Sequence, residues 1–505
     1  MAARLRFPRL ALPGAATRRP MTSSRFKWVF DPKNNAQTHG PYSVLIVGGG
    51  FSGTMLAFQM LRRDPELDLA IVDSGDKPGR GLAYSTTHRC HVLNVPAKGM
   101  SALADDLGHF LRWARCNYDP NVRDEDFLPR MVYGRYLDSL LEEAATKSGR
   151  DLPWFRDQVL TLTHVDGVYS AQLKTGKRIL AKTVVIATGN VPPGDPEVPG
   201  LTEAATRYFP FSWSQTALDG LRGSDDVLLI GSGLTGVDLA IGLASDGFRG
   251  KIHVLSRRGR LPQAHKPAGT WPQFWNEKSP RTVRGLLRLI RNQVSAAADA
   301  GIGWRSVIDA LRPVTPEIWR SLPGVERKRF VRHVRTYWDV HRHRIAPDVS
   351  EQLTRLISED RIQIHAGRVT HYREDENQAV VTFRLRRDGR AEQLHVGRVI
   401  NCTGPEADWR RIDNSLFSSL FAQRLARPDS LFLGVDTDHN GCVLNWQGTA
   451  SRSLFAIGPL RKGGLWETTA VPELRQQAYS LAEHIARVIS EEGCAEEQPT
   501  DSLSR

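Results

Sequence analysis

The chain has 505 residues, of which 40% are hydrophobic and 24% are charged. A chain of this length can bury a large core, and at ~100–200 residues per domain it divides into two or three domains. Charged residues or glycine interrupt every apolar stretch before it reaches the ~18–20 residues that a membrane-spanning helix needs. We therefore expect no membrane span.

The five cysteines are scattered, with no Cys-x-x-Cys pair and no histidine cluster at metal-ligand spacing. This pattern predicts neither a metal site nor a disulfide framework, and it is typical of a cytoplasmic protein. The formal net charge of +13 is spread along the chain. Because phosphorylated small molecules also need basic sites, the charge does not by itself favour a nucleic-acid partner. The sequence leaves the oligomeric state open.

The first thirty residues are rich in arginine and contain no acidic residue. An organelle transit peptide has this composition. A disordered tail, or a gene start placed too early with Met21 as the initiator, explains it more simply. We expect residues 1–40 to lie outside the folded part of the chain.

A strand pattern at residues 43–47 runs directly into Gly48-Gly49-Gly50-Phe51-Ser52-Gly53. A helical pattern follows at residues 54–63, and a second strand at residues 69–72 ends at an acid. This order predicts a Rossmann βαβ unit that binds a dinucleotide, with its diphosphate at the helix N-terminus. A glycine-rich turn without a ligand is the alternative. The expected contacts are Gly48, Gly50, Phe51, Ser52, Gly53, Asp73 and Ser74.

The same order recurs in mid-chain, where a strand at residues 226–230 precedes Gly231-Ser232-Gly233-Leu234-Thr235-Gly236. Here the closing strand ends in Ser256-Arg257-Arg258 and not in an acid. Two guanidinium groups suit a ribose 2′-phosphate, which favours NADPH over NADH. An exposed basic turn is the alternative. The expected contacts are Gly231, Gly233, Leu234, Thr235, Gly236, Arg257 and Arg258.

A β-meander pattern follows each unit and returns to a small-residue turn, at Thr188-Gly189 and at Gly404. This repeat predicts an α/β fold with two nested Rossmann-type dinucleotide-binding domains, each of three layers (ββα) with a β-meander. We expect Thr188, Gly189 and Gly404 to lie beside the bound dinucleotides.

Near its end the chain has a strand at residues 454–457, a glycine turn at Gly458-Pro459, and an amphipathic helix at residues 471–489. Such an arrangement can place backbone amides against an isoalloxazine ring, whose reduced form carries negative charge. We therefore expect FAD in the first site and NAD(P)H in the second. Gly458, Pro459, Glu467 and Thr468 are the expected third contact with FAD.

A helical pattern rich in arginine and tryptophan occupies residues 271–347. It is too long for a simple loop, so we expect a helical cap over the substrate cleft. The alternative is that its tryptophans are ordinary core and its arginines ordinary surface. The predicted domains are FAD-binding (41–220 and 405–490) and NAD(P)-binding (221–404, with a helical insertion at about 270–350), followed by a flexible tail (491–505).

From about Tyr42 to Ile489, the chain resembles the largely uncharacterised bacterial FAD/NAD(P)-binding proteins that are related to flavin monooxygenases and pyridine-nucleotide oxidoreductases. The resemblance rests on residues 79–86, 91–97, 130–136, 256–259 with Pro262 and His265, and 466–475. It implies that Leu93, Asn94 and Val95 lie beside the flavin. The chain departs from many flavoproteins at Pro459, where an aspartate commonly follows the glycine.

The sequence predicts an oxidoreductase in which NADPH passes a hydride to FAD, and the flavin passes electrons to oxygen or another acceptor. With oxygen, the protein is a monooxygenase, and some relatives suggest a small amine or amino acid as substrate. A flavin reductase without oxygen insertion and a non-catalytic redox sensor are the alternatives. His265 is the candidate catalytic residue because its side chain can exchange protons near neutral pH, although a structural role fits it equally well.

Overall fold

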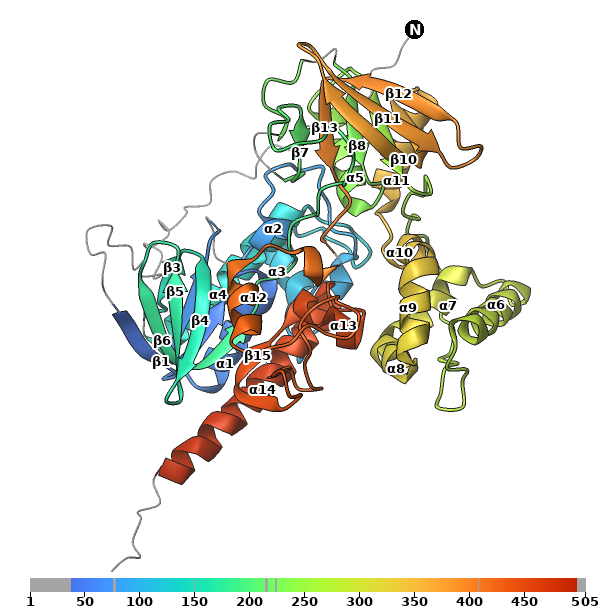
Figure 1. Cartoon of the computed structure of the whole chain (residues 1–505). Helices are drawn as coiled ribbons and strands as arrows, with labels where there is room; N and C mark the ends of the chain where they lie inside the picture. Colours follow the sequence, from blue (N-terminus) through green and yellow to red (C-terminus); the bar gives the residue numbers. More distant parts are fainter. Residues whose placement is uncertain are drawn as a thin grey trace, which may run out of the picture.

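A computed structural model of the chain describes residues 38–75, 79–149, 151–213, 217–222, 225–406 and 408–496. Figure 1 shows two lobes, each built on a sheet, with a separate group of helices beside them. The predicted N-terminal tail lies outside the described residues, except that the first strand already begins at Thr38. Within the described residues, no helix is long and apolar enough to cross a membrane.

The first sheet has eight strands, and its central strands are parallel. Residues 44–47 are buried on both faces, as a parallel sheet covered on both sides requires. Its main path is β14 (Cys442–Leu444), β15 (Ala450–Ala456), β6 (Arg178–Ile186), β1 (Thr38–Val47), β2 (Leu69–Asp73) and β3 (Trp154–Arg156), and β4 (Val159–Val165) and β5 (Val168–Leu173) complete the meander.

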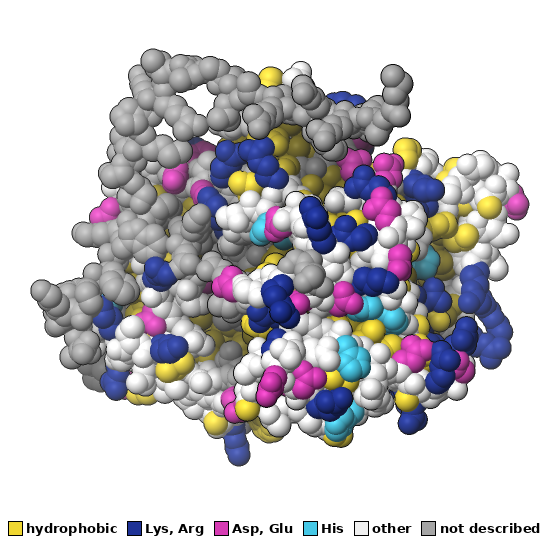
Figure 2. Space-filling view, turned by 90° about the horizontal axis from the view of Figure 1, so that it is seen from above, with side chains coloured by type: hydrophobic (Ala, Val, Ile, Leu, Met, Phe, Trp, Pro, Cys, Tyr) yellow, Lys and Arg dark blue, Asp and Glu magenta, His cyan; other side chains and the backbone are white. Residues whose placement is uncertain are grey.

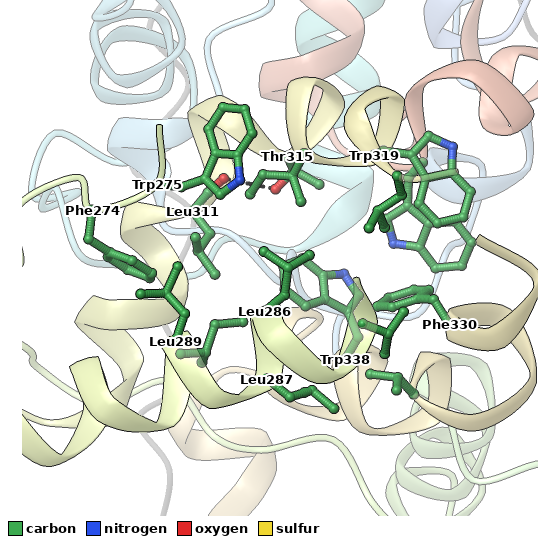
Figure 3. A pocket seen from close by; sticks show the side chains of 16 residues that line it. Phe274, Trp275, Leu286, Leu287, Leu289, Leu311, Thr315, Trp319, Phe330 and Trp338 are labelled. Atoms are coloured by element: carbon green, nitrogen blue, oxygen red, sulfur yellow. Dashed lines mark hydrogen bonds between the residues drawn. The ribbon is translucent and has the colours of Figure 1, made fainter. Parts of the chain in front are cut away.

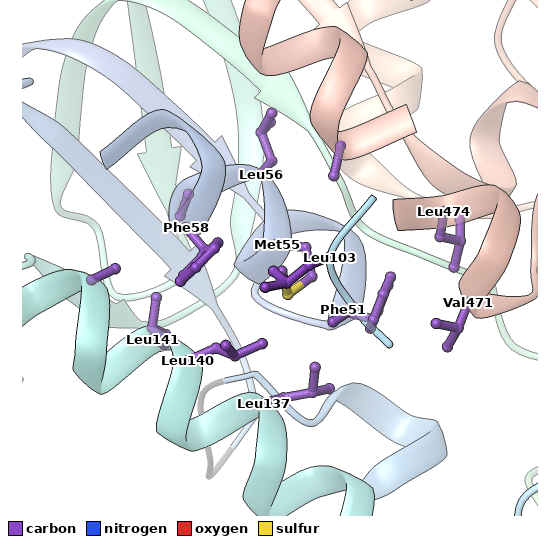
Figure 4. Close-up of a cluster of buried hydrophobic side chains, with 14 of the residues drawn as sticks. Phe51, Met55, Leu56, Phe58, Leu103, Leu137, Leu140, Leu141, Val471 and Leu474 are labelled. Carbon is purple, nitrogen blue, oxygen red and sulfur yellow. The ribbon is translucent and has the colours of Figure 1, made fainter. Parts of the chain in front are cut away.

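Three helices pack together on one face of this sheet: α1 (Phe51–Arg63), α4 (Arg130–Ser148) and α14 (Val471–Glu496). Their apolar side chains meet around Met55 and Leu140, with Leu474 reaching in from the last helix (Figure 4). The meander and α12 (Ser415–Ala422) share a core on the other face. The smaller elements here are α2 (Gly81–Tyr84), η1 (Ala97–Gly99), α3 (His109–Asn117) and η4 (Trp409–Arg411).

The second sheet has seven strands. The helices α5 (Leu234–Ser245) and α11 (Pro347–Ser358) pack against it through a common apolar core. Its order is β12 (Ala391–Val396), β11 (Ala379–Leu385), β10 (Ile362–Glu374), β9 (Ile252–Ser256), β8 (Val227–Ile230), β13 (Arg398–Asn401) and β7 (Tyr208–Phe209). The predicted fold class, with two Rossmann-type units, is therefore confirmed.

Two details differ from the boundaries that we expected. Tyr208 and Phe209 fall within the range predicted for the first domain, but they pair with β13 of the second sheet. Residues 491–496 continue α14, where we expected a flexible tail. β7 makes its hydrogen bonds with a strand that is far away in the sequence, and residues 491–496 extend a helix that has already formed. The composition of either short segment does not reveal this.

The predicted helical insertion lies between β9 and α11. It consists of α6 (Val283–Asp299), α7 (Trp304–Ala310), the single turn η3 (Arg312–Val314), α8 (Thr315–Ser321), α9 (Gly324–His333) and α10 (Arg335–Arg342). It also contacts the first domain at the segment formed by η5 (Gly458–Arg461) and α13 (Lys462–Leu465), because Trp319 Nε1 donates a hydrogen bond to the Gly463 carbonyl at 2.7 Å. The insertion thus joins the two domains.

Figure 2 shows one face of the molecule, on which Lys and Arg side chains are dispersed among Asp and Glu side chains. Such mixed charge suits a solvated surface, whereas a nucleic-acid-binding face usually gathers its cations in one stripe.

Candidate functional site: two glycine loops and the segments around them

The first glycine loop joins the end of β1 to the start of α1 in a very tight turn. Gly48 has φ +107°, and a Cβ atom there would lie 2.4 Å from the Ala187 carbonyl oxygen. A Cβ atom on Gly53 would lie 1.9 Å from the Gly48 carbonyl oxygen. Only glycine fits at both positions, so strand and helix approach closely and the helix N-terminus faces the end of the strand.

The second glycine loop repeats this geometry. Gly231 has φ +121°, and its Cβ atom would lie 2.3 Å from the Cys402 carbonyl oxygen. A Cβ atom on Gly236 would lie 2.3 Å from the Gly231 carbonyl oxygen. In both loops, the first and the last glycine are therefore each required by a backbone carbonyl oxygen that leaves no room for a side chain.

The two helix N-termini that follow these loops suit an anionic ligand. Their N-cap residues, Gly50 and Gly233, have φ/ψ of −72°/−165° and −79°/−167°. Neither helix has a side-chain cap or an acidic residue in its first turn. The free amides and the helix dipole can therefore bind a diphosphate, and the space that a side chain would take is left to the ligand.

The expected side-chain contacts in the first loop divide into two groups. Phe51 is buried and stacks on Tyr133 in the core, so only its backbone amide is available to a ligand. Asp73 ends β2 as predicted, and its carboxylate accepts a hydrogen bond from the Gly75 amide at 3.2 Å. Burial raises the pKa of Asp73, although the amides of Gly49, Ser74 and Gly75 oppose the shift.

A segment of the resemblance packs directly on the first loop. A Cβ atom on Gly81 would lie 3.1 Å from the Gly50 Cα atom, and Gly81 has φ +51°. The neighbouring Arg80 donates from Nε to both carboxylate oxygens of Asp138 on α4, at 3.2 and 3.0 Å. This ion pair holds the segment against the loop. The arginine of the Gly-Arg-Gly sequence thus anchors the segment, and Gly81 allows its close approach to Gly50.

The C-terminal segment reaches the start of α1, as the sequence predicts. Gly458 has φ +81°, and its Cβ atom would lie 2.7 Å from Ser52 Oγ. Thr468 Oγ1 donates to the Gly458 carbonyl at 2.7 Å, and Gln477 bonds to both residues. Pro459 occupies the first turn of η5, where a missing N–H costs nothing.

Glu467 lies in the same segment but turns toward the helical insertion. It is buried, and its Oε1 accepts a hydrogen bond from Trp338 Nε1 at 2.8 Å, while Arg342 lies 3.5 Å from Oε2. Burial alone would raise the pKa of Glu467, but Arg342, His343 and the Trp338 hydrogen bond lower it below the ordinary value. The carboxylate is therefore charged and serves as the anchor between the insertion and the first domain.

His265 meets the segment that the resemblance places beside the flavin. Its Nε2 donates a hydrogen bond to the Asn94 carbonyl at 3.0 Å, and its ring lies 5.1 Å from that of Phe127. Leu93 is buried, and its amide donates to the Leu128 carbonyl at 2.8 Å. Burial lowers the pKa of His265 to about 4, Arg344 adds to the shift, and the bond to Asn94 opposes it. The imidazole is neutral at pH 7 and holds the second domain to the first.

Beyond the second loop, the predicted arginines lie in a cluster of cations. Burial lowers the pKa of Arg257, and Arg368, Arg335 and Arg258 lower it further. The guanidinium of Arg258 lies 4.7 Å from the Tyr337 ring centroid. Among the described residues, neither Arg257 nor Arg258 has a carboxylate at ion-pair distance. A cluster of cations that repel one another is stabilised by an anion.

Both meanders end in an open glycine turn. Gly189 has φ +73° and Gly404 has φ +82°, and among the described residues no atom comes within 4 Å of a Cβ placed on either. Thr188 is exposed beside the first turn, and Leu234 and Thr235 are half-buried at the start of α5. Both turns therefore leave room beside the glycine loops, where the sequence placed the ligands.

The sequence did not predict one buried ion pair that also joins the domains. Arg130 at the start of α4 lies 2.7 Å from the Asp238 carboxylate on α5, and both side chains are nearly buried. Burial raises the pKa of Asp238 to about 6, although Arg130 opposes the shift. Arg130 stands in a segment of the resemblance, but its partner lies 108 residues away, so only the tertiary structure reveals the pair.

His265 bridges the domains, and its lowered pKa predicts that the stability of the protein depends on pH. The folded-state pKa of His265 is about 4, below the unfolded value of ~6.5, so the stability that it contributes is present above pH 6.5 and is lost as pH falls toward 4. The loss is at most about 3 kcal/mol. In His265→Gln, whose amide can donate but does not titrate, we expect the melting temperature to fall less between pH 7 and pH 4.5. The exposed control His371→Gln is expected to match the wild type. An equal fall in all three proteins would contradict the assignment.

Comparisons with known proteins agree with this geometry. Residues 45–191 match the family model of FAD-NAD(P)-binding proteins. An uncharacterized protein of Escherichia coli K12, YdhS, is 24% identical over 257 residues, which are 44% of this chain and 46% of that protein. The match thus spans about half the length of this relative.

Solved structures share the fold over 89% of this chain. The Kutzneria ornithine N-hydroxylase KtzI superposes with a TM-score of 0.60 at 14% identity, covering 99% of that chain. DfoA, a cadaverine monooxygenase from Erwinia amylovora solved with FAD, has a TM-score of 0.62 at 14% identity over 95% of its chain. L-lysine 6-monooxygenase from Pseudomonas syringae has a TM-score of 0.61 at 15% identity over its full length. The chain thus carries an FAD/NAD(P)-binding domain and has the fold of flavin-dependent monooxygenases.

Proposed function

We propose that this protein is an FAD-dependent NADPH oxidoreductase, with FAD on the first glycine loop and NADPH on the second. The duplicated loop geometry carries the proposal, because each loop leaves an uncapped helix N-terminus free for a diphosphate. Three other segments of the chain, at Gly81, Ala187 and Gly458, pack against the first loop. A large cofactor needs contacts from several such segments. The second loop leads to Arg257 and Arg258, which have no carboxylate partner among the described residues and suit a 2′-phosphate.

When bound, FAD would accept a hydride from NADPH and pass the electrons to an acceptor. The chain supplies position and charge. Gly50 and Gly233 give the diphosphates access to backbone amides, and the bond from His265 holds Asn94 in place. Trp338 and Arg342 fix Glu467, so the insertion is tied to the segment that leads to Thr468 and Gly458. The role of His265 in this proposal is to position the flavin segment.

For the acceptor, we propose oxygen, with hydroxylation of a small polar substrate of the amine or amino-acid type. The solved structures named above support this choice, since their names give ornithine, cadaverine and lysine as substrates. Within the described residues, no group of histidine, cysteine and acidic side chains is placed to hold a metal ion. In this proposal the flavin carries the redox chemistry.

A second candidate is electron transfer without oxygen insertion. The bacillithiol disulfide reductase of Staphylococcus aureus shares the fold with a TM-score of 0.52 at 15% identity, covering 92% of this chain and all of that chain. The five cysteines of this chain include no Cys-x-x-Cys pair, which disfavours a dithiol relay. A small acceptor such as a quinone would fit this candidate better than a disulfide.

Purified protein distinguishes these functions. We expect bound FAD that NADPH bleaches without oxygen, and oxygen uptake that exceeds peroxide release when an amine or amino-acid substrate is present. Peroxide release equal to oxygen uptake with every amine and amino acid tested would favour the reductase. A bound flavin that neither NADPH nor NADH reduces would contradict both enzymatic functions and favour the redox sensor.

The second glycine loop can be tested by a substitution that the protein itself tolerates. Among the described residues, no atom lies within 4 Å of a Cβ placed on Gly233, so Gly233→Ala should leave folding and FAD content unchanged. Its methyl group would occupy space that we assign to the NADPH diphosphate. We expect KM for NADPH to rise roughly tenfold, because a displaced charged hydrogen bond costs about 1.5–3 kcal/mol.

The control for this loop is Gly301→Ala, which also adds a methyl group into open space, on the helical insertion. Gly301 has φ +70°, which is unfavourable for alanine, so the melting temperature of Gly301→Ala is measured together with its KM for NADPH. An unchanged KM for NADPH in Gly233→Ala would contradict the assignment of the second loop.

The arginine cluster predicts which nicotinamide is preferred. Arg257→Ala and Arg258→Ala each remove one cation expected at the 2′-phosphate, so kcat/KM should fall about 10- to 100-fold for NADPH, by about 1.5–3 kcal/mol per charged hydrogen bond. The value for NADH should change little. Steady-state kinetics with both nucleotides measures the ratio, and exposed Arg249→Ala is the matched control. A parallel loss with NADH would contradict 2′-phosphate recognition.

A further inference from the structure

The helical insertion reaches the arginines that follow the second glycine loop. Near the start of α10, the ring centroid of Tyr337 lies 4.7 Å from Arg258 Cζ and 4.6 Å from Arg260 Cζ. A guanidinium at this distance is attracted to the ring face. The charges of Arg258 and Arg260, and hydrogen bonds from both, lower the pKa of the Tyr337 hydroxyl below its ordinary value. One side chain of the insertion thus contacts two arginines of the second Rossmann unit at once.

The turn that carries these arginines is fixed to the second glycine loop. Within that loop, the Ser232 hydroxyl donates to the Arg260 carbonyl at 2.6 Å, and it is also hydrogen-bonded to Ser256 Oγ at 2.8 Å. Ser256 Oγ accepts from the Gly259 amide at 3.0 Å. Gly259 has φ +60°, and a Cβ atom there would lie 3.0 Å from the Cβ atom of Ala366 on β10. The backbone at the arginines therefore keeps a fixed position relative to the loop.

Two further arginines lie close to this turn, and acidic side chains are scarce around it. Burial lowers the pKa of Arg257, and the charges of Arg368 on β10 and Arg335 on α10 are among those that lower it further. In the part of the chain that the structure describes, Asp339 is the one carboxylate at ion-pair distance from any arginine of this group, 3.4 Å from Arg335 Nε. An excess of positive charge of this kind favours a ligand with more than one negative charge.

The residue after Tyr337 turns toward the inside of the insertion. Tyr337 is exposed, whereas Trp338 lies with Leu286 and Phe330 among the side chains that line an apolar cavity (Figure 3). Trp338 Nε1 also donates to Glu467 of the first domain. Buried contacts thus fix α10 on one side, and this helix holds Tyr337 against the arginines on the other.

We infer that Tyr337 is a positioning residue of the nucleotide site, whose ring holds Arg258 and Arg260 as a pair that binds the 2′-phosphate of NADPH. The inference rests on the NADPH site proposed above, and it adds to that site Arg260 and a residue of the insertion. Each guanidinium has five N–H donors, so contacts with the phenol leave others for phosphate oxygens. Without the ring, two flexible side chains that repel each other would have to be ordered by the ligand, which weakens binding.

The test measures the binding of three adenosine nucleotides to the whole FAD-loaded protein by isothermal titration calorimetry, without turnover. Adenosine 2′,5′-bisphosphate has the 2′-phosphate, adenosine 3′,5′-bisphosphate has the same group on the neighbouring carbon, and 5′-AMP lacks it. We expect the wild type to bind the 2′,5′-bisphosphate roughly tenfold more tightly than either of the others, as for one or more charged hydrogen bonds.

In Tyr337→Leu, we expect the affinity for the 2′,5′-bisphosphate to fall roughly 3- to 10-fold, the size of one or two cation–π contacts at an exposed site, and the affinity for 5′-AMP to stay unchanged. Tyr337→Phe keeps the ring and should lose less. Arg260→Ala should bind the 2′,5′-bisphosphate roughly tenfold more weakly. The matched control is Tyr118→Leu, because Tyr118 is also exposed and its ring centroid lies 5.9 Å from Arg135 Cζ. All three affinities should be unchanged in this control.

The outcomes separate this inference from the proposed NADPH site. Wild-type affinity of Tyr337→Leu for the 2′,5′-bisphosphate, with weakened binding by Arg258→Ala, would overturn the role of Tyr337 and leave the NADPH site in place. Equal losses in Tyr337→Leu and Tyr337→Phe, or an equal loss for 5′-AMP, would also overturn it. Equal binding of the two bisphosphates by the wild type would indicate attraction by charge alone.

A wild type that binds 5′-AMP as tightly as the 2′,5′-bisphosphate would contradict 2′-phosphate recognition itself, and the inference with it. If Tyr337→Leu does not fold, Tyr337→Gln, which also removes the ring, takes its place with the same expected result.

Discussion

Both halves of this protein depend on one steric constraint, the close approach of a helix N-terminus to the strand that precedes it. A Cβ atom at Gly53 or Gly236 would overlap the carbonyl oxygen of the first glycine of its loop. Because these positions lack side chains, the first-turn amides of each helix face an open end of the sheet. A diphosphate bound there interacts with several donors at once and with the helix dipole.

The helical insertion then sets how the two halves meet. It extends from the second domain and contacts the C-terminal segment of the first domain. The contacts are the hydrogen bonds of Trp319 and Trp338 and the ion pair of Arg342 with Glu467. Trp319, Arg342 and Glu467 are buried and Trp338 is half-buried, so an unpaired partner would be costly. The hydrogen bond from His265 to Asn94 and the ion pair of Arg130 with Asp238 add two further contacts between the domains. Such directional contacts fix one orientation more strictly than apolar packing alone.

The insertion has a second consequence. Its helices line an apolar cavity, and the wall of this cavity includes Trp466, whose φ is positive.

The sequence by itself determined the two βαβ units, their glycine loops and the arginines after the second loop, because these features depend on short-range order: a strand, a turn that only glycine can make, and a helix. It also predicted Gly458 and Thr468 as contacts of the first cofactor, and the structure brings Gly458 against Ser52 and Thr468 against Gly458. Tertiary structure alone decided that Phe51 turns into the core, that Glu467 anchors the insertion, and that β7 joins the second sheet. These outcomes depend on partners more than a hundred residues away or on which face of an element is covered, and no local pattern encodes either.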